Sequence, residues 1–450
     1  MTDAGGMIAT MTHGTLLGVN IISGWVPVGV MVFGLVVVVV LAFASLGRRV
    51  PCRRWGPRIG LAAVFGAVGG WCVGWWVSDL WNPFDAALSV GTRLWLMATG
   101  VGIGLAVANL WGTRWWARVV AIVSIPTIVF VGAVGVNADV GEYPTLSAAL
   151  NLTAIAPLNI RQSPDLTSSG ASPTWQHWKP PPGMPRTGTL GSVTIPGVVS
   201  HFTARPAIVY LPPAALVASG PQLPVMIVMS GQPGTPSDIF VKGAFRHALD
   251  GFAAVHNGMA PIVVVPDQLG TQTANPMCVD SPLGNSASYI TVDVVDWIQA
   301  HLNVDPDRTA WTIGGFSQGG TCAIQLGAAD PGRFGSILDI SGQEAPRNGT
   351  RAHTIGVGFG GDSAKYDAAA PLTILAKNAP YVDEFAVFAV GENDTRYRPV
   401  QEKLSRAAIA AGMTVDAVTI KGTAHDWYTA TEGLRQGLEL VDQRLGLAAG

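Results

Sequence analysis

The chain has 450 residues, of which only 12% are charged, and its formal net charge is −2. Its mean hydropathy of +0.36 is high for a water-soluble protein, and the excess of apolar residues lies before about position 137. The near-neutral charge, without a basic patch in the later part of the chain, argues against a nucleic-acid-binding protein. Composition instead predicts a membrane region followed by a globular domain.

Four uncharged apolar stretches are each long enough to cross a bilayer. They are Ile21–Leu46, Ile59–Ser78, Leu94–Trp111 and Val119–Val136. Tryptophans near their ends, such as Trp25 and Trp76, are typical of the membrane–water interface. We therefore predict an α-helical region of four transmembrane helices over residues 1–140.

The arginines between these stretches predict the orientation in the membrane. The loop after the first stretch holds Arg48, Arg49, Arg53, Arg54 and Arg58, and the loop after the third holds Arg114 and Arg118. Cytoplasmic loops of membrane proteins are enriched in Lys and Arg, so both loops should face the cytoplasm. A multi-pass protein of the cytoplasmic membrane follows, with its amino terminus and its carboxy-terminal domain on the extracytoplasmic side.

Residues 141–187 are rich in Ser, Thr and Pro and show neither helical nor strand periodicity. Such a composition is typical of a partly extended linker. Trp175 and Trp178 are too apolar for a linker that is wholly solvated. We therefore expect part of this segment to pack on the domain that follows.

From residue 188 to residue 450 strand-like and helix-like segments alternate. The strand-like runs are Leu190–Ile195, Ala207–Leu211, Val225–Met229, Ile262–Val265, Ala310–Gly314, Ser336–Ile340, Phe385–Val390 and Thr414–Ile420. The helix-like segments are Ile239–His256, Tyr289–His301, Thr321–Ala329 and Pro399–Ala411. This alternation predicts a mostly parallel sheet covered on both faces. The first strands have no helix between them and should pair antiparallel at one edge.

One pentapeptide in this domain, Gly315-Phe316-Ser317-Gln318-Gly319, lies between a strand-like and a helix-like segment. In α/β-hydrolases this pattern forms a sharp turn that raises a nucleophilic serine above the sheet. Glycines two positions before and after the serine keep Cβ atoms out of the turn, and the helix that follows presents its positive end. We predict Ser317 as a nucleophile.

A serine hydroxyl needs a base to remove its proton, and that base needs an acid to orient it. In this fold the acid follows the serine along the chain, and the histidine that acts as the base follows the acid. His425 follows the last strand-like run and is the predicted base, whereas His353 is interpreted as an exposed loop residue. Asp394, in the turn after Phe385–Val390, is the predicted acid, and Glu392 in the same turn is the alternate.

Acyl transfer also needs donors for the oxyanion that forms on the attacked carbonyl. The backbone amide of Gln318, directly after the serine, is one predicted donor. The turn after Val225–Met229 reads Ser230-Gly231-Gln232-Pro233-Gly234, and the amide of Gln232 is the other. Its glycines and proline suit a backbone that turns an amide toward the serine.

Two cysteines, Cys278 and Cys322, lie in the domain predicted to be exported, where oxidation is permitted. Cys322 begins the helix after Ser317, and Cys278 lies in a loop. We hypothesise a disulfide that clamps this loop beside the active site. Two buried free thiols are the alternative.

Neither a cofactor nor a metal is expected. The run Gly356-x-Gly358-x-x-Gly361 matches a dinucleotide fingerprint in its letters, but it does not join an early strand to its helix. Histidines and carboxylates nowhere show the spacing of a metal site.

Several blocks of residues 188–445 resemble the esterase family of α/β-hydrolases, which includes esterase D-type enzymes and the antigen-85 mycolyltransferases. The blocks are Leu223-Pro224-Val225 with Gly231-Gln232-Pro233-Gly234, Asp280–Gly284, Ile313–Gly320 and Gly422-Thr423-Ala424-His425-Asp426-Trp427. A four-span region ahead of such a domain is similar to membrane-bound actinobacterial members. The resemblance implies the site roles given above and a serine-based acyl-enzyme.

Together these observations predict a membrane-anchored, extracytoplasmic serine esterase or acyltransferase. Its expected partners are an acyl ester of a lipid or an envelope glycolipid and the bilayer itself. Three alternatives stay open: mycolyltransferase-like acyl transfer to a sugar, a serine peptidase, and a non-catalytic envelope-binding module on a hydrolase fold.

Overall fold

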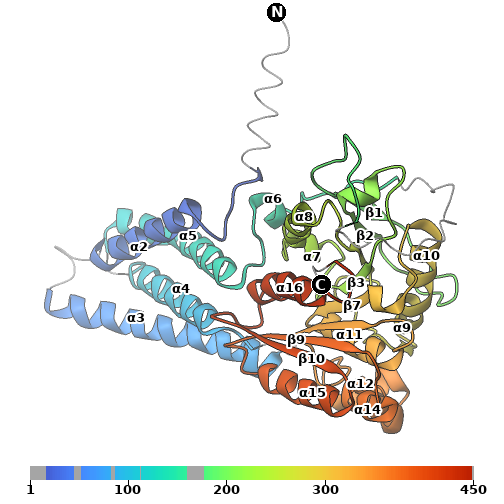
Figure 1. Ribbon diagram of the computed structural model, residues 1–450. Coiled ribbons are helices and arrows are strands. Elements are labelled where there is room, and N and C mark those ends of the chain that lie inside the picture. Colours follow the sequence, from blue (N-terminus) through green and yellow to red (C-terminus); the bar gives the residue numbers. More distant parts are fainter. Residues whose placement is uncertain (1–16, 45–51, 83–86, 112, 160–176, 448–450) are drawn as a thin grey trace, which may run out of the picture. The chain divides into compact units, whose positions relative to one another are not determined.

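The computed structural model describes residues 17–44, 52–82, 87–111, 113–159 and 177–447. The chain folds as two compact units, Met1–Thr153 and Ala154–Gly450 (Figure 1).

The first unit is helical. Its long helices are α2 (Trp25–Ala44), α3 (Cys52–Trp75), α4 (Val90–Ala108) and α5 (Trp115–Val140), and a π-helical turn, η1 (Trp76–Trp81), continues α3. Among the described residues, four helical segments are long and apolar enough to cross a membrane. They overlap the four predicted stretches but differ at their ends. The first begins at Trp25 rather than Ile21, because Oδ1 of Asn20 accepts hydrogen bonds from the amides of Ile22 and Ser23 and holds a turn there.

Helices α3 and α4 pack in backbone contact. A Cβ atom at Gly66 would lie 2.1 Å from the carbonyl oxygen of Gly100, and one at Gly100 would lie 2.1 Å from that of Gly66. Only glycine allows such an approach. Small residues at helix contacts are typical of membrane helices, where burial from water does not drive association.

The second unit is built on an eight-stranded sheet with the order β1-β2-β4-β3-β7-β8-β9-β10. Its strands are β1 (Thr189–Val193), β2 (Ala207–Leu211), β3 (Val225–Met229), β4 (Ile262–Val265), β7 (Trp311–Phe316), β8 (Ser336–Ile340), β9 (Phe385–Gly391) and β10 (Thr414–Ile420). β2 pairs antiparallel with β1 and with β4, and the other pairs are parallel. The predicted mostly parallel sheet with an antiparallel edge is confirmed. A two-residue hairpin, β5 (Asp280–Ser281) and β6 (Gly284–Asn285), lies outside this sheet and outside the predicted strands.

Helices cover both faces of the sheet (Figure 1). The longer ones are α8 (Phe245–Val255), α10 (Val294–His301), α11 (Gln318–Ala329), α12 (Arg351–Phe359), α14 (Pro371–Asn378), α15 (Arg398–Ala410) and α16 (Trp427–Val441). The shorter ones are α7 (Asp238–Val241), α9 (Ser286–Ser288), α13 (Ser363–Ala368), the π-helical turn η3 (Tyr289–Asp293) and the 3₁₀ turns η2 (Pro213–Leu216) and η4 (Arg308–Ala310).

The alternation of side chains along β8 shows how α11 and α16 are divided between the faces. Gly327 of α11 lies against Ile337, whereas Gly437 of α16 lies against Leu338, the next residue of the same strand. Successive strand residues point to opposite faces, so α11 and α16 cover opposite sides of the sheet. Central strands such as β3 are therefore buried along their whole length.

Two predicted helices differ from the structure. The segment predicted as one helix over 239–256 is divided into α7 and α8. Lys242, Gly243 and Ala244 lie between them, and Ala244 has a φ of +48°. The segment over 289–301 begins with the π-helical turn η3 before it becomes α10. In both cases the apolar periodicity continues through the irregularity, which is why the sequence predicted one helix.

The segment predicted as a linker is described over residues 141–159 and 177–187. Helix α6 (Leu146–Ala149) is capped by Thr145, whose Oγ1 accepts from the amide of Ala148. Pro157 forms a bridge with Ser192 of β1, and Leu158 and Trp178 pack on the core of the second unit. Trp175 lies outside the described residues.

Candidate active site

Ser317 lies in a strained turn between β7 and α11. Its φ of 58° and ψ of −117° place it outside the regions that residues with a side chain usually adopt. A Cβ atom at Gly315 would lie 2.4 Å from the carbonyl carbon of Gly319, and one at Gly319 would lie 2.3 Å from the carbonyl oxygen of Met229. The turn therefore requires glycine at both positions. The amide of Ser317 donates to the carbonyl oxygen of Ile340, 2.8 Å away, at the end of β8.

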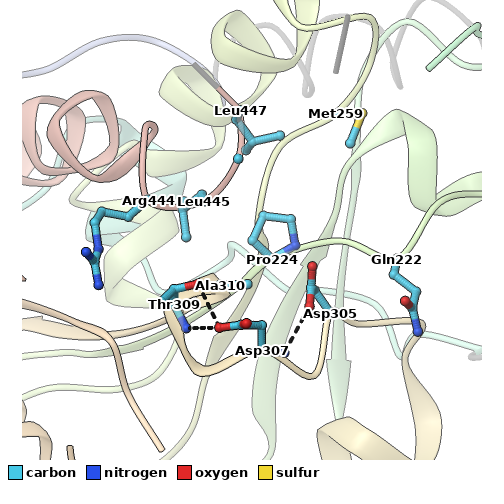
Figure 2. Close-up of a pocket in the computed structure, with 11 residues that line it drawn as sticks. Gln222, Pro224, Met259, Asp305, Asp307, Thr309, Ala310, Arg444, Leu445 and Leu447 are labelled. Carbon is cyan, nitrogen blue, oxygen red and sulfur yellow. Dashed lines mark hydrogen bonds between the residues drawn. The ribbon is translucent and has the colours of Figure 1, made fainter. Parts of the chain in front are cut away.

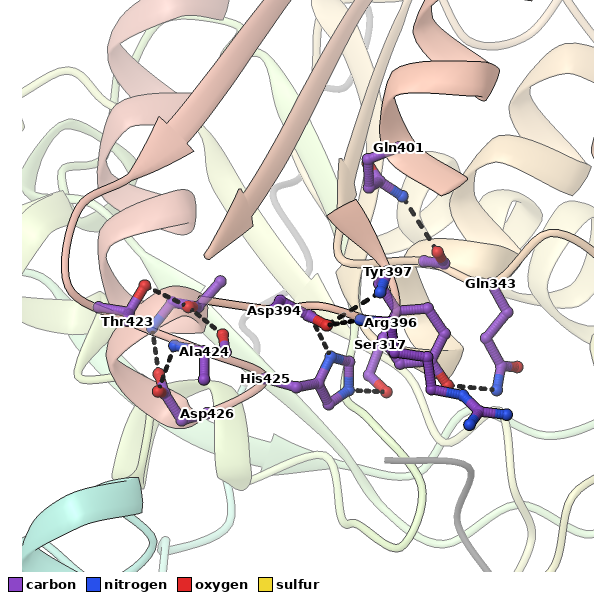
Figure 3. A network of polar contacts seen from close by, with 12 residues as sticks. Ser317, Gln343, Asp394, Arg396, Tyr397, Gln401, Thr423, Ala424, His425 and Asp426 are labelled. Carbon is purple, nitrogen blue, oxygen red and sulfur yellow. Dashed lines mark hydrogen bonds and ion pairs between the residues drawn. The ribbon is translucent and has the colours of Figure 1, made fainter. Parts of the chain in front are cut away.

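The predicted serine, histidine and aspartate meet in one hydrogen-bonded line (Figure 3). Nε2 of His425 lies 2.8 Å from Oγ of Ser317, and Nδ1 lies 3.0 Å from Oδ2 of Asp394. The side chain of His425 is 9% exposed and that of Asp394 is 1% exposed. The three residues come from the ends of β7, β9 and β10, which are brought together because parallel strands end at the same edge of the sheet.

The other oxygen of Asp394 is held by the backbone. Oδ1 accepts hydrogen bonds from the amides of Tyr397, at 2.9 Å, and Arg396, at 3.2 Å. Only Oδ2 then faces the imidazole, so the proton of neutral His425 belongs on Nδ1 and Nε2 is free to accept one from Ser317. The arrangement can activate a serine hydroxyl.

The alternate acid, Glu392, points elsewhere. Its side chain is exposed, and Oε2 accepts from the amide of Gly422, 2.9 Å away. This bond ties the turn after β9 to the turn after β10, the segment that carries His425. The other histidine weighed as a base, His353, is exposed as predicted, but it lies in helix α12 rather than a loop. The loop interpretation was wrong because Thr350 caps that helix, accepting from the amide of His353 at 3.2 Å.

The rings of Tyr397 and Phe316 lie against the imidazole of His425, and neither contact was predicted from the sequence. The ring centroid of Tyr397 lies 4.6 Å from that of His425, and the centroid of Phe316 lies 5.1 Å from it. Trp427 in turn lies against Phe316 at 5.5 Å. Tyr397 directly precedes α15, and no pattern in the sequence indicates which way its ring points.

Of the two residues predicted to supply oxyanion donors, Gln318 directly follows Ser317, and Gln232 lies in the turn that passes beside it. Gln318 is the first residue of α11, where backbone amides lack partners within the helix. The turn that holds Gln232 passes close to the serine, because a Cβ atom at Gly231 would lie 3.4 Å from Cβ of Ser317. This distance corresponds to van der Waals contact, so the turn after β3 and the start of α11 both lie next to Ser317.

The predicted disulfide is present. Cys278 and Cys322 are bonded, and both side chains are buried. The bond joins the loop after β4 to α11, four residues beyond Gln318. Among the described residues Cys72 is a free cysteine, exposed on α3.

A buried acid that the sequence did not single out lies behind the turn. Asp339 of β8 is fully buried and accepts from Nε2 of Gln401 at 3.1 Å and from the amide of Gly342 at 2.8 Å. Burial raises its pKa to about 7. A Cβ atom at Gly320 would lie 2.5 Å from Oδ1 of Asp339, so the acid packs directly against the start of α11.

The cavity drawn in Figure 2 lies at the other end of the sheet, at residues that precede β3 and β7. It has a volume of about 200 Å³, and Asp305, Asp307 and Arg444 are among its polar lining residues. Both carboxylates form hydrogen bonds with neighbouring residues of the chain. Asp305 accepts from the amide of Asp307, and Asp307 accepts from the amide and hydroxyl of Thr309. Within the described parts of the chain, no three His, Cys, Asp or Glu side chains are grouped as metal ligands.

A parallel sheet with a strained serine at a strand–helix turn, and a histidine–carboxylate pair beside it, defines an α/β-hydrolase of the serine hydrolase class. Residues 203–431 match the model of the family described as putative esterase. The chain belongs to this esterase family.

The chain is 31% identical to an uncharacterised protein of Corynebacterium glutamicum over 420 residues, which cover 90% of this chain and 93% of that protein. This stretch is longer than the second unit, so the likeness extends into the helical unit. Among solved structures, an S-formylglutathione hydrolase from Agrobacterium tumefaciens is 20% identical, with a TM-score of 0.49 over 58% of this chain and 97% of that chain. A ferulic acid esterase from Anaeromyces mucronatus is 14% identical, with a TM-score of 0.43 over 63% of this chain and 97% of that chain.

Proposed function

We propose that the protein hydrolyses or transfers acyl esters with Ser317 as the nucleophile, His425 as the general base and Asp394 as the acid that orients it. The observation that carries the proposal is the line of contacts from Ser317 Oγ through both ring nitrogens of His425 to Asp394, at 2.8 and 3.0 Å. Glu392 is not needed in this role, because its carboxylate bonds Gly422.

In the first half of the reaction, Oγ of Ser317 forms a bond to the ester carbonyl carbon while its proton passes to Nε2 of His425. Negative charge moves to the carbonyl oxygen, where the amides of Gln318 and Gln232 are the proposed donors. The tetrahedral adduct then collapses: the bond to the alkoxide breaks, and the alkoxide takes the proton from Nε2. An acyl group remains on Ser317.

In the second half, water or an alcohol, such as a sugar hydroxyl, gives its proton to Nε2 and attacks the acyl-enzyme. The same donors stabilise the second oxyanion, and Ser317 regains its proton as it leaves. Hydrolysis and transfer share every protein group in this scheme and differ only in the acceptor. Product analysis with and without an added sugar therefore distinguishes them.

Labelling with a fluorophosphonate probe tests the nucleophile. Full-length protein in detergent should be labelled, and Ser317→Ala should abolish both labelling and hydrolysis of p-nitrophenyl esters. Ser363→Ala is the matched control, because Ser363 is an exposed residue of α13. Labelling that persists in Ser317→Ala would refute the assignment.

We infer that the substrate is the acyl ester of a lipid or an envelope glycolipid. The support is the helical unit, whose four long apolar helices would hold the esterase unit beside a bilayer. Protein reconstituted in vesicles should then release fatty acid from an ester of the vesicle lipid, or transfer it to an added sugar. Activity confined to short, water-soluble esters, even in vesicles, would contradict this substrate class.

We also propose that residues 1–140 anchor the protein in the cytoplasmic membrane, that 141–187 link the parts, and that the catalytic domain from residue 188 lies outside. The support is the arginines of the two loops predicted to be cytoplasmic, including Arg114 and Arg118. Val382→Cys, in a variant whose Cys52 and Cys72 are serine, should react with a membrane-impermeant maleimide in intact cells, because Val382 is exposed on the second unit. Reaction only after lysis would reverse the orientation.

A further inference from the structure

A buried glutamine outside the proposed triad bridges the two segments that carry the proposed oxyanion donors. Gln268, in the loop after β4, is 1% exposed. Its Nε2 donates to the carbonyl oxygen of Ser230, at 2.6 Å, and to Oε1 of Gln318, at 3.0 Å. The first bond ends on the turn that holds Gln232, and the second ends on the residue directly after Ser317.

We propose that Gln268 is a positioning residue of the oxyanion site, which sets the separation of the two donor amides. The inference rests on the proposed function and deepens it. Both hydrogens of the Gln268 amide are used, one on each segment, so loss of this single group removes both contacts. The bond to Ser230 fixes a peptide plane directly before Gly231, and therefore limits how the Gln232 amide can turn.

The receiving side chain is itself held at its other end. Nε2 of Gln318 donates to Oδ1 of Asn275 at 3.3 Å and lies 3.8 Å from Sγ of Cys278, one half of the disulfide. Gln318 is 4% exposed. A buried amide whose oxygen and nitrogen are both bonded cannot rotate without leaving a polar group unpaired, which is unfavourable. The start of α11 is thereby tied to the loop that carries Gln268.

Further contacts secure the loop to the Gln232 turn. The guanidinium of Arg205 bonds Asp267 at 2.6 and 2.9 Å and the carbonyl oxygen of Gly234 at 3.1 Å. The amide of Gly234 donates to the carbonyl oxygen of Gln272 at 3.0 Å. These contacts hold the loop to the turn, whereas the bond from Gln268 to Gln318 carries the restraint across to the serine.

The effect of losing Gln268 should be confined to the transition state. Donors that are preset for a developing oxyanion lower the barrier only while charge is present there, so ground-state binding is little affected. The amide of Gln268 donates to Ser230 and Gln318 rather than to His425 or Asp394, so proton transfer should keep its pH dependence. A structural role alone would show as lower thermal stability without this selectivity.

The test compares full-length protein with Gln268→Met in detergent, because methionine keeps the length of the side chain and removes both N–H donors. With p-nitrophenyl butyrate, kcat should fall about tenfold to a hundredfold while KM stays within about threefold. The inhibition constant of an alkyl boronic acid, which forms a tetrahedral adduct on serine, should rise by a similar factor. The pH midpoint of kcat/KM should not move.

Gln318→Met removes the acceptor from the other side and keeps the backbone amide. It should lower kcat similarly, and the double variant should be less than additive, since both changes break one contact. Gln443→Met is the matched control, because Gln443 is exposed near the end of α16. Should Gln268→Met not fold, the Gln318→Met kinetics decide the question in the same way.

The inference would be overturned if kcat and boronate affinity were unchanged in both variants. It would also be overturned if KM changed by the same factor as kcat and the effects of the two substitutions were fully additive. These outcomes are separable from failure of the proposed function. If a fluorophosphonate does not label the wild-type protein, the proposed nucleophilic role of Ser317 is refuted. If the wild-type protein is labelled and the Gln268→Met and Gln318→Met variants keep its kcat, only the positioning role is refuted.

Discussion

The ring of Tyr397 lies against the imidazole of His425, with 4.6 Å between the centroids and 42° between the planes. The amide of the same tyrosine donates to Oδ1 of Asp394, the residue that bonds Nδ1 of His425. Tyr397 therefore contacts the histidine with its side chain and the carboxylate with its backbone. The hydroxyl accepts a hydrogen bond of 3.4 Å from Nε2 of Gln343.

We expect Tyr397→Ala to lower kcat by about tenfold or more, because an imidazole without this ring can rotate away from Ser317, and small misplacements of catalytic groups are costly. Tyr397→Phe keeps both the ring and the backbone amide and should stay within about threefold of wild type. Kinetics on p-nitrophenyl butyrate, with a thermal scan of each variant, test this. Wild-type kcat in Tyr397→Ala would show that the ring does not position the base.

Asp394→Asn should lower kcat by about 10⁴, the loss that this replacement causes in a serine protease triad. The amides of Arg396 and Tyr397 would hold the Asn oxygen, so its NH₂ group would face Nδ1 of His425. Nδ1 would then be the acceptor, and the proton would move to Nε2, where it blocks attack by Ser317. Single-turnover kinetics measure the loss.

Glu392→Gln is the companion variant, since glutamine can still accept from the amide of Gly422. It should stay within about threefold of wild type. If instead Glu392→Gln abolished activity while Asp394→Asn retained it, the two carboxylates would have to exchange roles.

Strand limits were predictable wherever an apolar run ends at a turn residue. β3 begins directly after Pro224, and β8, like β3, has the predicted bounds. The order of Ser317, Asp394 and His425 along the chain was likewise enough to find the three residues that the structure brings together. Chain order carries this information because each residue follows a strand of one parallel sheet.

The residues around them were not predictable, for a physical reason. Gln268 and Asp339 act through side chains that reach another strand end or helix, and a single sequence does not record which side chains meet. The division of the segment 239–256 into two helices was missed because apolar periodicity persists across Gly243. At that glycine the backbone turns, and an added Cβ would lie 2.6 Å from the carbonyl oxygen of Ile239.

Replacing both Cys278 and Cys322 with alanine should lower the free energy of unfolding by about 2–4 kcal/mol, since the bond closes a loop between residues 44 apart. The midpoint of thermal unfolding should fall accordingly. Cys72→Ser is the control, because Cys72 is free and exposed on α3. A thermal midpoint unchanged in the double alanine variant, with and without dithiothreitol, would show that the bond does not stabilise the fold.

Stability should decline as the pH rises from about 4 to about 8, because two buried acids bind protons more tightly in the folded chain than in the unfolded one. Burial raises the pKa of Asp339 from 3.8 to about 7 and that of Glu384 from 4.5 to about 8, although Glu384 also pairs with Arg308 at 2.9 Å. Between the unfolded and folded pKa values the native state holds protons that the unfolded state has released. The free energy of unfolding therefore decreases with pH through this window.

Asp339→Asn should remove the contribution of the Asp339 proton to the pH dependence of stability. The amide can still accept from the N–H of Gly342, and it carries no charge to desolvate at high pH. We expect the thermal midpoint of the variant to fall less than that of wild type between pH 5 and pH 8, with the largest gain over wild type near pH 8. Asp416→Asn is the matched control, because Asp416 is exposed on β10 and its replacement should leave the pH profile unchanged. Parallel profiles for wild type and Asp339→Asn would mean that Asp339 is ionised in the folded protein throughout, and that its hydrogen bonds, rather than its proton, compensate for burial.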